Sequence, residues 1–367
     1  MTQSFPYSKN QNFPERYISP EKLFSFLQDN YSHQIQEIGK SSLGKPIYMM
    51  TLGTGTIRVA AWSQMHGNES TATLAMLDLL QIFREHPELQ EKLFSLIQLD
   101  FIFMLNPDGS ETWSRRNAYD IDINRDFIRN SSNEMRVLKS VVIEGNYSYL
   151  LNLHDQRTIF TTDGIHPATM SFLSASEDLD RTITENRKKA MAVIAAVYMQ
   201  MKAILPRRIG KYTDEFYPTS AGDNFMKLGI PSILFEGGFY ENDLERAKTR
   251  QYYAHALYYA LKAISVLKGD TLSYETYFDI PENKETHFDI IYRNVKLNTE
   301  FECIMDIAVQ YREILDENKH ITYQPYVVEV GDVTNKKGWK EIDCTGKKFI
   351  SVTKFPKLDA QPDFRIE

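Results

Sequence analysis

Four short apolar runs, separated by helical patterns, place the strongest constraint on how this chain can fold. The runs cover residues 57–62, 96–105, 147–153 and 232–235. Strands that are apolar along their whole length are typical of sheets covered on both faces. Apolar residues at helical spacing lie between and after the runs, most clearly at 74–80, 135–141, 178–205 and 243–267. This alternation predicts an α/β fold in which a mixed, largely parallel sheet carries helices on both faces.

The N-terminal part of the chain carries two local signals. Ser19, followed by Pro20 and by apolar residues at helical spacing, predicts a capped helix start. The stretch 35–53 alternates β-prone residues around a Ser-Ser-Leu-Gly sequence, and this pattern predicts a hairpin.

The chain changes character after Gly269-Asp270. Its 367 residues exceed the roughly 250 to 300 at which single cores usually stop growing, so two domains are expected. Beyond residue 272 the sequence is rich in Ile, Val, Tyr and Phe at strand spacing and shows no long helical pattern. We therefore expect an α/β domain over residues 1–271 and a small all-β domain over residues 272–367.

Charge and composition argue against several classes of partner. The formal net charge of −7 argues against nucleic acid, because phosphate binding needs concentrated Lys and Arg. The first residues lack the basic start and apolar core of a signal peptide, and no apolar stretch is long enough to span a bilayer. With only Cys303 and Cys344, the simplest expectation is a cytoplasmic protein with reduced thiols and no membrane partner. A single disulfide is the alternative.

Polar residues follow each of the predicted strands. In open α/β sheets, ligands bind at the carboxyl ends of the strands. The four runs are followed by His66-Gly67-Asn68-Glu69, Asn106-Pro107-Asp108-Gly109, His154 and Glu236-Gly237-Gly238. All four strand ends therefore present candidate site residues.

His66 and Glu69 are three residues apart and can converge on one ion from a tight turn or the first turn of a helix. This spacing alone is a weak signal, because chance produces it in about every second chain of this composition. His154 adds a third ligand from a separate strand end, and two histidines with one carboxylate form a known hydrolytic zinc set. The alternatives are that His66 packs in the core or caps a helix, and that His154 is an ordinary hydrogen-bonded histidine at the edge of the sheet.

An arginine-rich polar region lies between these segments. Arg115, Arg116 and Asn117 precede the sequence Asp-Ile-Asn-Arg-Asp-Phe at 122–127. Arginines near a metal site suit carboxylate binding and carbonyl polarisation. A surface loop with ordinary salt bridges is the alternative.

Taken together, these motifs resemble the zinc metallocarboxypeptidase family, the carboxypeptidase A-like enzymes. The resemblance covers roughly residues 18–267 and rests on HGNE, NPDG, SRRN, DINRDF, the strand-ending His154, and YPTSAGDN followed by LGIPSILFEGG, in this order. It implies a carboxypeptidase-like fold, one Zn²⁺ per chain and hydrolysis of the C-terminal amide bond of peptides. His66, Glu69 and His154 would be the zinc ligands. Glu236 would take a proton from the attacking water and give it to the leaving amine.

The resemblance also implies roles for the polar region. Arg115 would stabilise the oxyanion of the tetrahedral intermediate. Asn124 and Arg125 would bind the terminal carboxylate of the substrate. Asp122 matches the carboxylate that orients a zinc-bound histidine.

Substrate preference is less well indicated by the resemblance. Tyr217 matches the tyrosine that closes over the substrate, although it lies closer to Glu236 in sequence than in the digestive enzymes. Asp223 and Asn224 both lie near the position that sets side-chain preference, and the sequence does not choose between them. Asp155 stands where the digestive enzymes have serine. Gly67 and Asn68, between His66 and Glu69, replace the bulkier, charged residues that those enzymes have there. The signal-less chain is more similar to bacterial members that trim small peptides, including peptidoglycan-derived ones.

Two other functions remain open from the sequence. A zinc amidohydrolase of the aspartoacylase or succinylglutamate desuccinylase type shares HGNE and the Asp-x-Asn-Arg segment, and would act on N-acyl amino acids. A non-catalytic binding protein on the same fold is the second alternative, although such relatives usually lose a ligand or the base. The C-terminal domain would be a transthyretin-like sandwich or an oligomerisation module, and the sequence does not indicate an oligomeric state.

Overall fold

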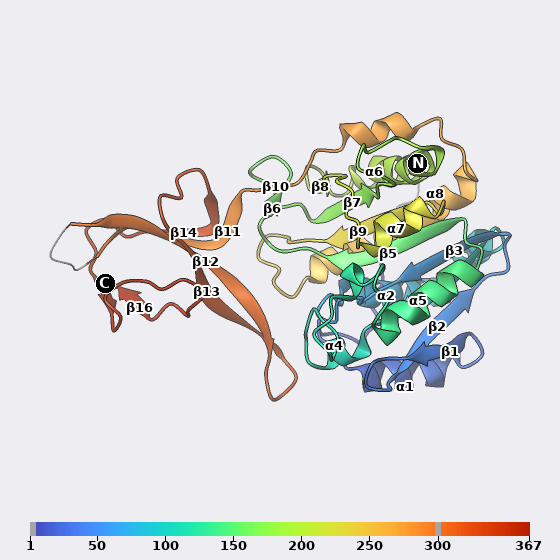
Figure 1. Cartoon of the computed structure of the whole chain (residues 1–367), viewed down its shortest axis with the longest axis horizontal. Coiled ribbons are helices and arrows are strands. Elements are labelled where there is room, and N and C mark those ends of the chain that lie inside the picture. Colours follow the sequence, from blue (N-terminus) through green and yellow to red (C-terminus); the bar gives the residue numbers. More distant parts are fainter. Residues whose placement is uncertain (1–4, 298–301) are drawn as a thin grey trace. The chain divides into compact units, whose positions relative to one another are not determined.

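The computed structural model describes residues 5–297 and 302–367 and divides into two compact units (Figure 1). The first unit comprises Met1–Gln156 and Ala168–Asn283, and the second comprises Arg157–Pro167 and Lys284–Glu367. The chain therefore passes from one unit to the other at three places. This division differs from the boundary expected near residue 272. The short helix η2 (Tyr274–Asp279) is part of the first unit, and the internal segment Arg157–Pro167 is part of the second.

The first unit is built on an eight-stranded mixed sheet with the order β1-β2-β4-β3-β5-β9-β7-β8. Its strands are β1 (Ile35–Lys40), β2 (Pro46–Leu52), β3 (Ile57–Trp62), β4 (Ile97–Phe103), β5 (Tyr149–Asp155), β7 (Met170–Ser174), β8 (Ile209–Lys211) and β9 (Ser232–Gly237). Neighbours β4, β3, β5 and β9 run parallel, whereas β1 with β2, β2 with β4, and β7 with β9 pair antiparallel. The predicted sheet and the predicted hairpin at 35–53 are confirmed.

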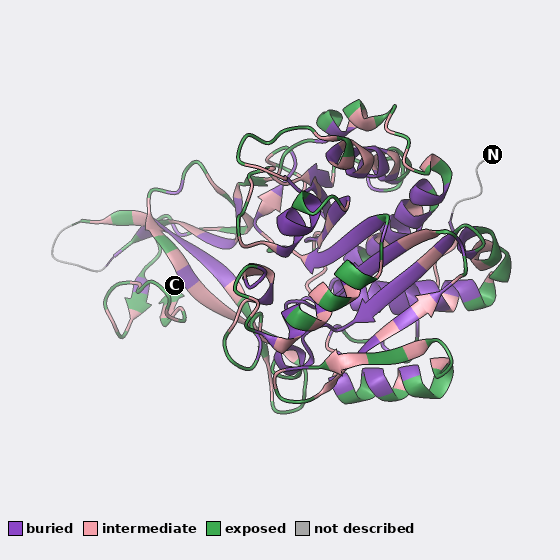
Figure 2. Ribbon diagram, turned by 45° about the vertical axis from the view of Figure 1, so that its right-hand side comes forward, coloured by how far each residue is buried: buried purple, intermediate pink, exposed green. Residues whose placement is uncertain are grey.

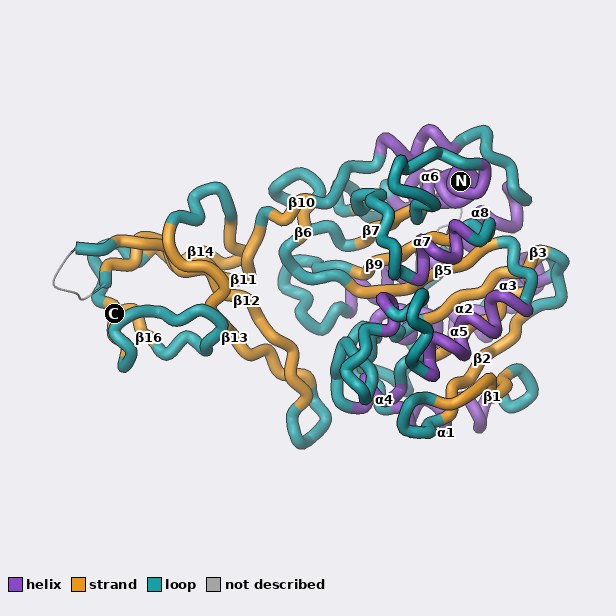
Figure 3. Tube along the Cα trace, viewed as in Figure 1, coloured by secondary structure: helices purple, strands orange, loops and turns teal. Residues whose placement is uncertain are grey.

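Helices cover both faces of this sheet (Figure 3). They are α1 (Pro20–Tyr31), α2 (Thr71–Glu85), α3 (Pro87–Phe94), α4 (Pro107–Glu111), η1 (Ile123–Arg125), α5 (Asn133–Glu144), α6 (Glu185–Met201), α7 (Ala221–Lys227) and α8 (Ala247–Leu267). One apolar cluster joins α2, α6 and α8 to alternate strand residues such as Val59 and Leu151. The other joins α5 and α7 to the intervening residues, such as Ala60 and Leu150. The central strands are buried along most of their length (Figure 2), as their continuous apolar sequences predict.

Element boundaries differ from the predicted ones where polar contacts decide them. Ser19 caps α1 as predicted, accepting from Lys22 N at 3.2 Å. The helix expected from residue 178 begins only at Glu185, because Thr184 caps it by accepting from Arg187 N. His154 lies inside β5 instead of after it, because its pairing with β9 continues to the end of both strands.

The second unit is all-β, as predicted for the C-terminal region. Its main sheet has the order β13-β12-β11-β14. The strands are β6 (Phe160–Thr161), β10 (Lys284–Glu285), β11 (His287–Lys296), β12 (Ile304–Leu315), β13 (Ile321–Gly331), β14 (Lys337–Asp343), β15 (Phe349–Ser351) and β16 (Phe364–Ile366). Strand β6, from the internal segment, pairs with β10. The unit has its own core around Ile290, Val309 and Phe349. Among the described residues of both units, no helix combines the length and hydropathy that a membrane span requires.

Candidate metal centre

The loop that carries His66 and Glu69 packs against the Asn-Pro-Asp-Gly sequence. A Cβ atom on Gly67 would lie 2.1 Å from the carbonyl carbon of Gly109, so the two backbones approach too closely for a side chain. Asn106 holds the second loop in place by accepting from Gly109 N at 2.9 Å, which caps α4. The two motifs therefore form one structural unit at the edge of the sheet.

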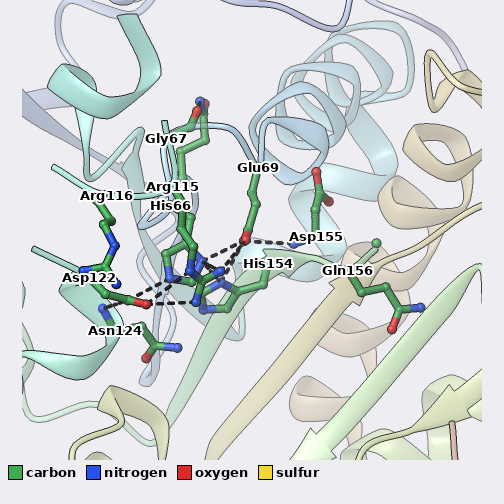
Figure 4. A network of polar contacts seen from close by, with 12 residues as sticks. His66, Gly67, Glu69, Arg115, Arg116, Asp122, Asn124, His154, Asp155 and Gln156 are labelled. Atoms are coloured by element: carbon green, nitrogen blue, oxygen red, sulfur yellow. Dashed lines mark hydrogen bonds and ion pairs between the residues drawn. The ribbon is translucent and has the colours of Figure 1, made fainter. Parts of the chain in front are cut away.

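His66, Glu69 and His154 converge near the carboxyl ends of β3 and β5 (Figure 4). Their ligand atoms all lie within 4.8 Å of one another. Glu69 Oε1 lies 2.8 Å from His66 Nδ1, and Glu69 Oε2 lies 2.9 Å from His154 Nδ1. The two Nδ1 atoms are 3.1 Å apart. The exposed fractions are 2%, 7% and 2%, so these donors are shielded from bulk water.

Asp122 determines which ring nitrogen of His66 faces this cluster. Asp122 Oδ1 lies 3.1 Å from His66 Nε2, where it accepts a hydrogen bond from a protonated Nε2. In that tautomer Nδ1 carries a lone pair, which faces Glu69 Oε1 and His154 Nδ1. A cation placed among these lone pairs satisfies all of them, and two imidazole nitrogens with one carboxylate oxygen are a donor set that Zn²⁺ takes. The residues therefore fit a metal ion.

The electrostatics of the cluster favour a cation. Burial raises the pKa of Glu69, but the two neighbouring histidines outweigh burial and hold this pKa well below its usual value. Burial also opposes ionisation of Asp122, but its hydrogen bond to His66 and the nearby positive charges lower its pKa. Burial lowers the pKa of His154, and the neighbouring Glu69 only partly offsets this. Two ionised carboxylates therefore lie beside a histidine that burial keeps neutral, and neutral imidazole is the form that binds metal.

Arg115 reaches the same donors. Its Nη1 lies 3.1 Å from His66 Nδ1 and 3.2 Å from Glu69 Oε1, and its Nε donates to Asp122 Oδ2 at 3.1 Å. The side chain is 45% exposed, so it can turn aside for a metal ion or a substrate. The neighbouring Arg116 instead donates to the carbonyl of Asp120, away from the cluster.

Glu236 lies beside His154 across the sheet. The two residues are register partners in the parallel strands β5 and β9, so their side chains are on the same face. Glu236 Oε2 is buried and has no hydrogen-bond partner among residues 5–297 and 302–367. Burial, followed by the charges of Glu69 and Asp155, raises the pKa of Glu236 well above its usual value. A raised pKa makes this carboxylate a stronger base than an exposed glutamate.

Asn124, Arg125 and Tyr217 are brought together beside this centre. The guanidinium group of Arg125 lies over the Tyr217 ring, 4.3 Å from its centroid. Asn124 Oδ1 accepts from Ala221 N at 3.2 Å, at the start of α7. Tyr217 is 52% exposed, so its ring is accessible to a ligand. A cationic group next to an exposed aromatic ring suits an anionic ligand.

The two candidates for side-chain preference hold the loop that leads to α7. Asp223 Oδ1 accepts from Ser176 N at 3.0 Å, and Oδ2 accepts from Tyr217 N at 3.1 Å. Asn224 Nδ2 donates to the carbonyls of Pro218 and Ser220, at 2.9 and 2.7 Å. Both side chains thus bind backbone groups, and their geometry does not single out one of them as the residue that selects the substrate.

Two residues around the centre were not singled out from the sequence: Arg246 and Tyr253, at the start of α8 and within it. Arg246 Nη1 donates to Gly237 O and Nη2 to Gln156 O, each at 2.7 Å. The Tyr253 hydroxyl lies 3.3 Å from the carbonyl oxygens of both His154 and Phe235. The only sequence signal for them is the Gly-Gly pair after Glu236, which indicates close packing at that strand end.

Comparison with known proteins gives one family match. The model of the zinc carboxypeptidase family, Peptidase M14, matches residues 21–186. No curated protein sequence matches the chain. The family resemblance drawn from the sequence motifs is thus confirmed over residues 21–186.

Similar solved structures include a metallo-carboxypeptidase from Burkholderia cenocepacia, with 18% identity over 69% of this chain and 70% of that one and a TM-score of 0.53. Carboxypeptidase A from Helicoverpa armigera has 14% identity over 68% and 74% of the two chains and a TM-score of 0.55. A metallo-carboxypeptidase from Pseudomonas aeruginosa, in complex with (2-guanidinoethylmercapto)succinic acid, has 15% identity over 69% of each chain and a TM-score of 0.51. At these identities the similarity concerns the fold.

Proposed function

We propose that this protein is a zinc-dependent metallocarboxypeptidase that hydrolyses the C-terminal amide bond of peptides. The observation that carries the proposal is the convergence of three buried donors, His66, Glu69 and His154, beside a fourth buried acidic group, Glu236. When bound, one Zn²⁺ per chain supplies Lewis acidity, which polarises a carbonyl group and lowers the pKa of water towards neutrality.

The residues of the chain would divide the reaction between them. Glu236, whose raised pKa suits proton exchange, would accept a proton from the attacking water and donate it to the leaving amine. Arg115, exposed enough to reorient, would donate hydrogen bonds to the developing oxyanion, a contribution typically worth about 10²- to 10³-fold in rate.

Recognition of the substrate's end would come from the second group of residues. Arg125 would pair with the terminal carboxylate and Asn124 would add a hydrogen bond, while Tyr217, stacked on Arg125, would close over the bound residue. Asp122 would hold His66 in the tautomer that presents Nδ1 to the metal.

The test is a panel of peptides and N-acyl amino acids incubated with zinc-loaded protein and read by mass spectrometry. Stepwise loss of C-terminal residues by the wild type, abolished in Glu236→Gln, is the expected result. Glu236→Gln removes the proton acceptor but none of the three donors, so its zinc content should match the wild type. Cleavage of N-acyl amino acids with no action on peptides would instead favour the amidohydrolase alternative.

A further inference from the structure

Asp155 is a buried carboxylate that the proposed reaction does not use. It follows His154 in β5, and because successive strand residues alternate, its side chain lies on the face opposite His154 and Glu236. There Asp155 Oδ2 accepts from both Thr71 N, at 3.2 Å, and Thr71 Oγ1, at 2.6 Å. Thr71 is the first residue of α2, two residues after Glu69.

The backbone of Asp155 contacts the metal donors directly. Its N–H donates to Glu69 Oε2 at 3.1 Å, the same oxygen that lies 2.9 Å from His154 Nδ1 (Figure 4). The carboxylate of Asp155 therefore anchors the strand end to α2, and its amide fixes the orientation of Glu69. Both contacts restrict how far the three donors can move relative to one another.

Arg246 joins the two strand ends on this same side of the sheet. Its guanidinium bridges the carbonyls of Gln156 and Gly237, which directly follow β5 and end β9. Nη1 also lies 3.8 Å from Asp155 Oδ2, and both side chains are more than nine-tenths buried. The backbone of Arg246 is left-handed, with φ of 55°, a conformation that residues other than glycine and asparagine seldom adopt without compensating contacts.

The Gly-Gly sequence after Glu236 makes room for this arrangement. A Cβ atom on Gly237 would lie 2.6 Å from Asp155 Oδ1, and one on Gly238 would lie 2.0 Å from the carbonyl oxygen of Ala168. Side chains at these positions would push the strand ends apart. The glycines, the carboxylate and the guanidinium thus form one packed layer behind the donors.

We propose that Arg246 and Asp155 are positioning residues that hold His154 in register with Glu236, and thereby set the geometry of both the metal site and the proton acceptor. This inference rests on the function proposed above. Positioning partners of metal ligands typically contribute about 10- to 100-fold in metal affinity. An arginine suits this position because its planar guanidinium holds two donors in a fixed fork that spans both carbonyls, whereas the ammonium of lysine is a compact group on a flexible stem.

The chain provides a matched control one turn further along, in α8. Arg250, four residues after Arg246 in α8, is also buried and forms an ion pair with Asp78, which accepts from Arg250 Nε at 2.7 Å. The same guanidinium donates to the carbonyl of Phe13, in the N-terminal segment and not at the ends of β5 or β9. The variants Arg246→Gln and Arg250→Gln therefore each break one buried ion pair, but only the first removes a bridge between the strand ends.

The experiment measures zinc affinity by competition with a chromophoric chelator, the electronic spectrum of the Co²⁺-substituted protein, kcat, KM and the melting temperature. We expect Arg246→Gln to weaken zinc binding about tenfold or more, alter the Co²⁺ spectrum and lower kcat with KM little changed. Arg250→Gln should lower the melting temperature at least as much, with unchanged zinc affinity and Co²⁺ spectrum. Equal effects of the two variants on zinc affinity, or an Arg246→Gln effect confined to melting, would overturn the proposal.

A second pair of variants keeps the test decisive if Arg246→Gln does not fold. Asp155→Asn still accepts from Thr71 but removes the counter-charge of Arg246, and Asp78→Asn is its matched control. Weaker zinc binding in Asp155→Asn alone supports the proposal, and unchanged binding in both contradicts it. A wild type that binds zinc but cleaves no peptide would overturn the proposed function, while the metal measurements would still decide the roles of Arg246 and Asp155.

Discussion

The Nε2 atom of His66 lies 3.1 Å from Asp122 Oδ1, on the opposite side of the ring from the Nδ1 atom that faces Glu69 and His154. This relationship fixes the ring's tautomer and its orientation together, and it links the Asp-x-Asn-Arg segment to the metal donors. It also provides the first test of the site.

We expect Asp122→Asn to weaken zinc binding by about 10- to 100-fold, because the amide can present its NH₂ to Nε2 and so favour the tautomer whose Nδ1 carries the proton. The measurement is chelator competition. Asp120→Asn is the control, since Asp120 is exposed and pairs only loosely with Arg116, at 3.7 Å. Unchanged affinity in Asp122→Asn would show that Asp122 does not orient the ligand.

Arg125→Gln should raise KM for peptides with a free C-terminal carboxylate by about tenfold or more, because a charge-assisted hydrogen bond is lost. Peptides with an amidated C-terminus should be poor substrates of both proteins and should not distinguish them. Tyr217→Phe keeps the ring that stacks on Arg125 and should preserve carboxylate binding better than Tyr217→Ala does. Equal KM values for wild type and Arg125→Gln would place the carboxylate contact elsewhere.

Asp78→Asn should lower the free energy of unfolding by about 3 kcal/mol, because removing one partner leaves the buried Arg250 charge uncompensated. Asp78 also accepts from Tyr7 Oη and from Asn10 N, at 2.9 and 2.7 Å, so the N-terminal segment should loosen as well. Denaturant unfolding gives the first quantity, and limited proteolysis within residues 5–13 reports the second. An Asp78→Asn variant as stable as the wild type would show that the Asp78–Arg250 ion pair does not contribute to stability.

The second unit should lose stability in acid through His287. Burial, together with the charge of Lys337, lowers the pKa of His287 from 6.5 to about 4. The unfolded chain therefore binds this proton at a higher pH than the folded chain does. The contribution is complete above about pH 6.5 and is lost as the pH falls towards 4. The lowered pKa corresponds to about 3 kcal/mol, which solvent screening of this ring reduces to about 1–2 kcal/mol.

The measurement is the pH dependence of unfolding for wild type and His287→Gln. The variant should show a flatter profile between pH 6.5 and 4. His320→Gln, at an exposed histidine of the same unit, should follow the wild type. Parallel profiles for wild type and His287→Gln would contradict the assignment.

A chain truncated after Asn283 should not yield a clean first unit. The segment 157–167 would remain, but its strand β6 would lose its pairing with β10. The hydrogen bond that Trp339 Nε1 donates to Thr158 O would also be lost, and the buried Ile159 would become exposed. We expect rapid proteolysis within this segment in the truncated chain and protection in the full chain, read by mass spectrometry. Equal protection in both chains would show that the segment folds without the second unit.

Much of this architecture could be predicted from the sequence because buried strands have a distinct pattern. The runs that form β3, β4, β5 and β9 are apolar on both faces, short, and bounded by polar or glycine residues, which is typical of strands inside a covered sheet. The convergence of the three candidate metal ligands could be predicted from their position at strand ends and from the order of the motifs. The internal segment 157–167 could not, because its membership in the second unit depends on long-range pairing with β10, which leaves no local pattern.

The contacts of Arg246 and Asp155 behind the candidate metal ligands could not be predicted from the sequence, for a different reason. Arg246 lies at a left-handed position before α8, where an arginine resembles an ordinary surface residue, and only the fold brings it to the ends of β5 and β9. The Asp155 carboxylate stood out from the sequence as a departure next to His154, but its partner Thr71 lies 84 residues away along the chain.

The central claim, a single metal centre formed by His66, Glu69 and His154, is tested most directly by the zinc stoichiometry of the purified protein. Metal-free protein would be re-equilibrated with limiting zinc, desalted and analysed by elemental mass spectrometry beside His154→Ala, with a folded far-ultraviolet circular dichroism spectrum required of both. We predict one zinc per chain in the wild type and almost none in the variant. A folded wild type that retains no zinc, or a variant that retains as much, would contradict the account.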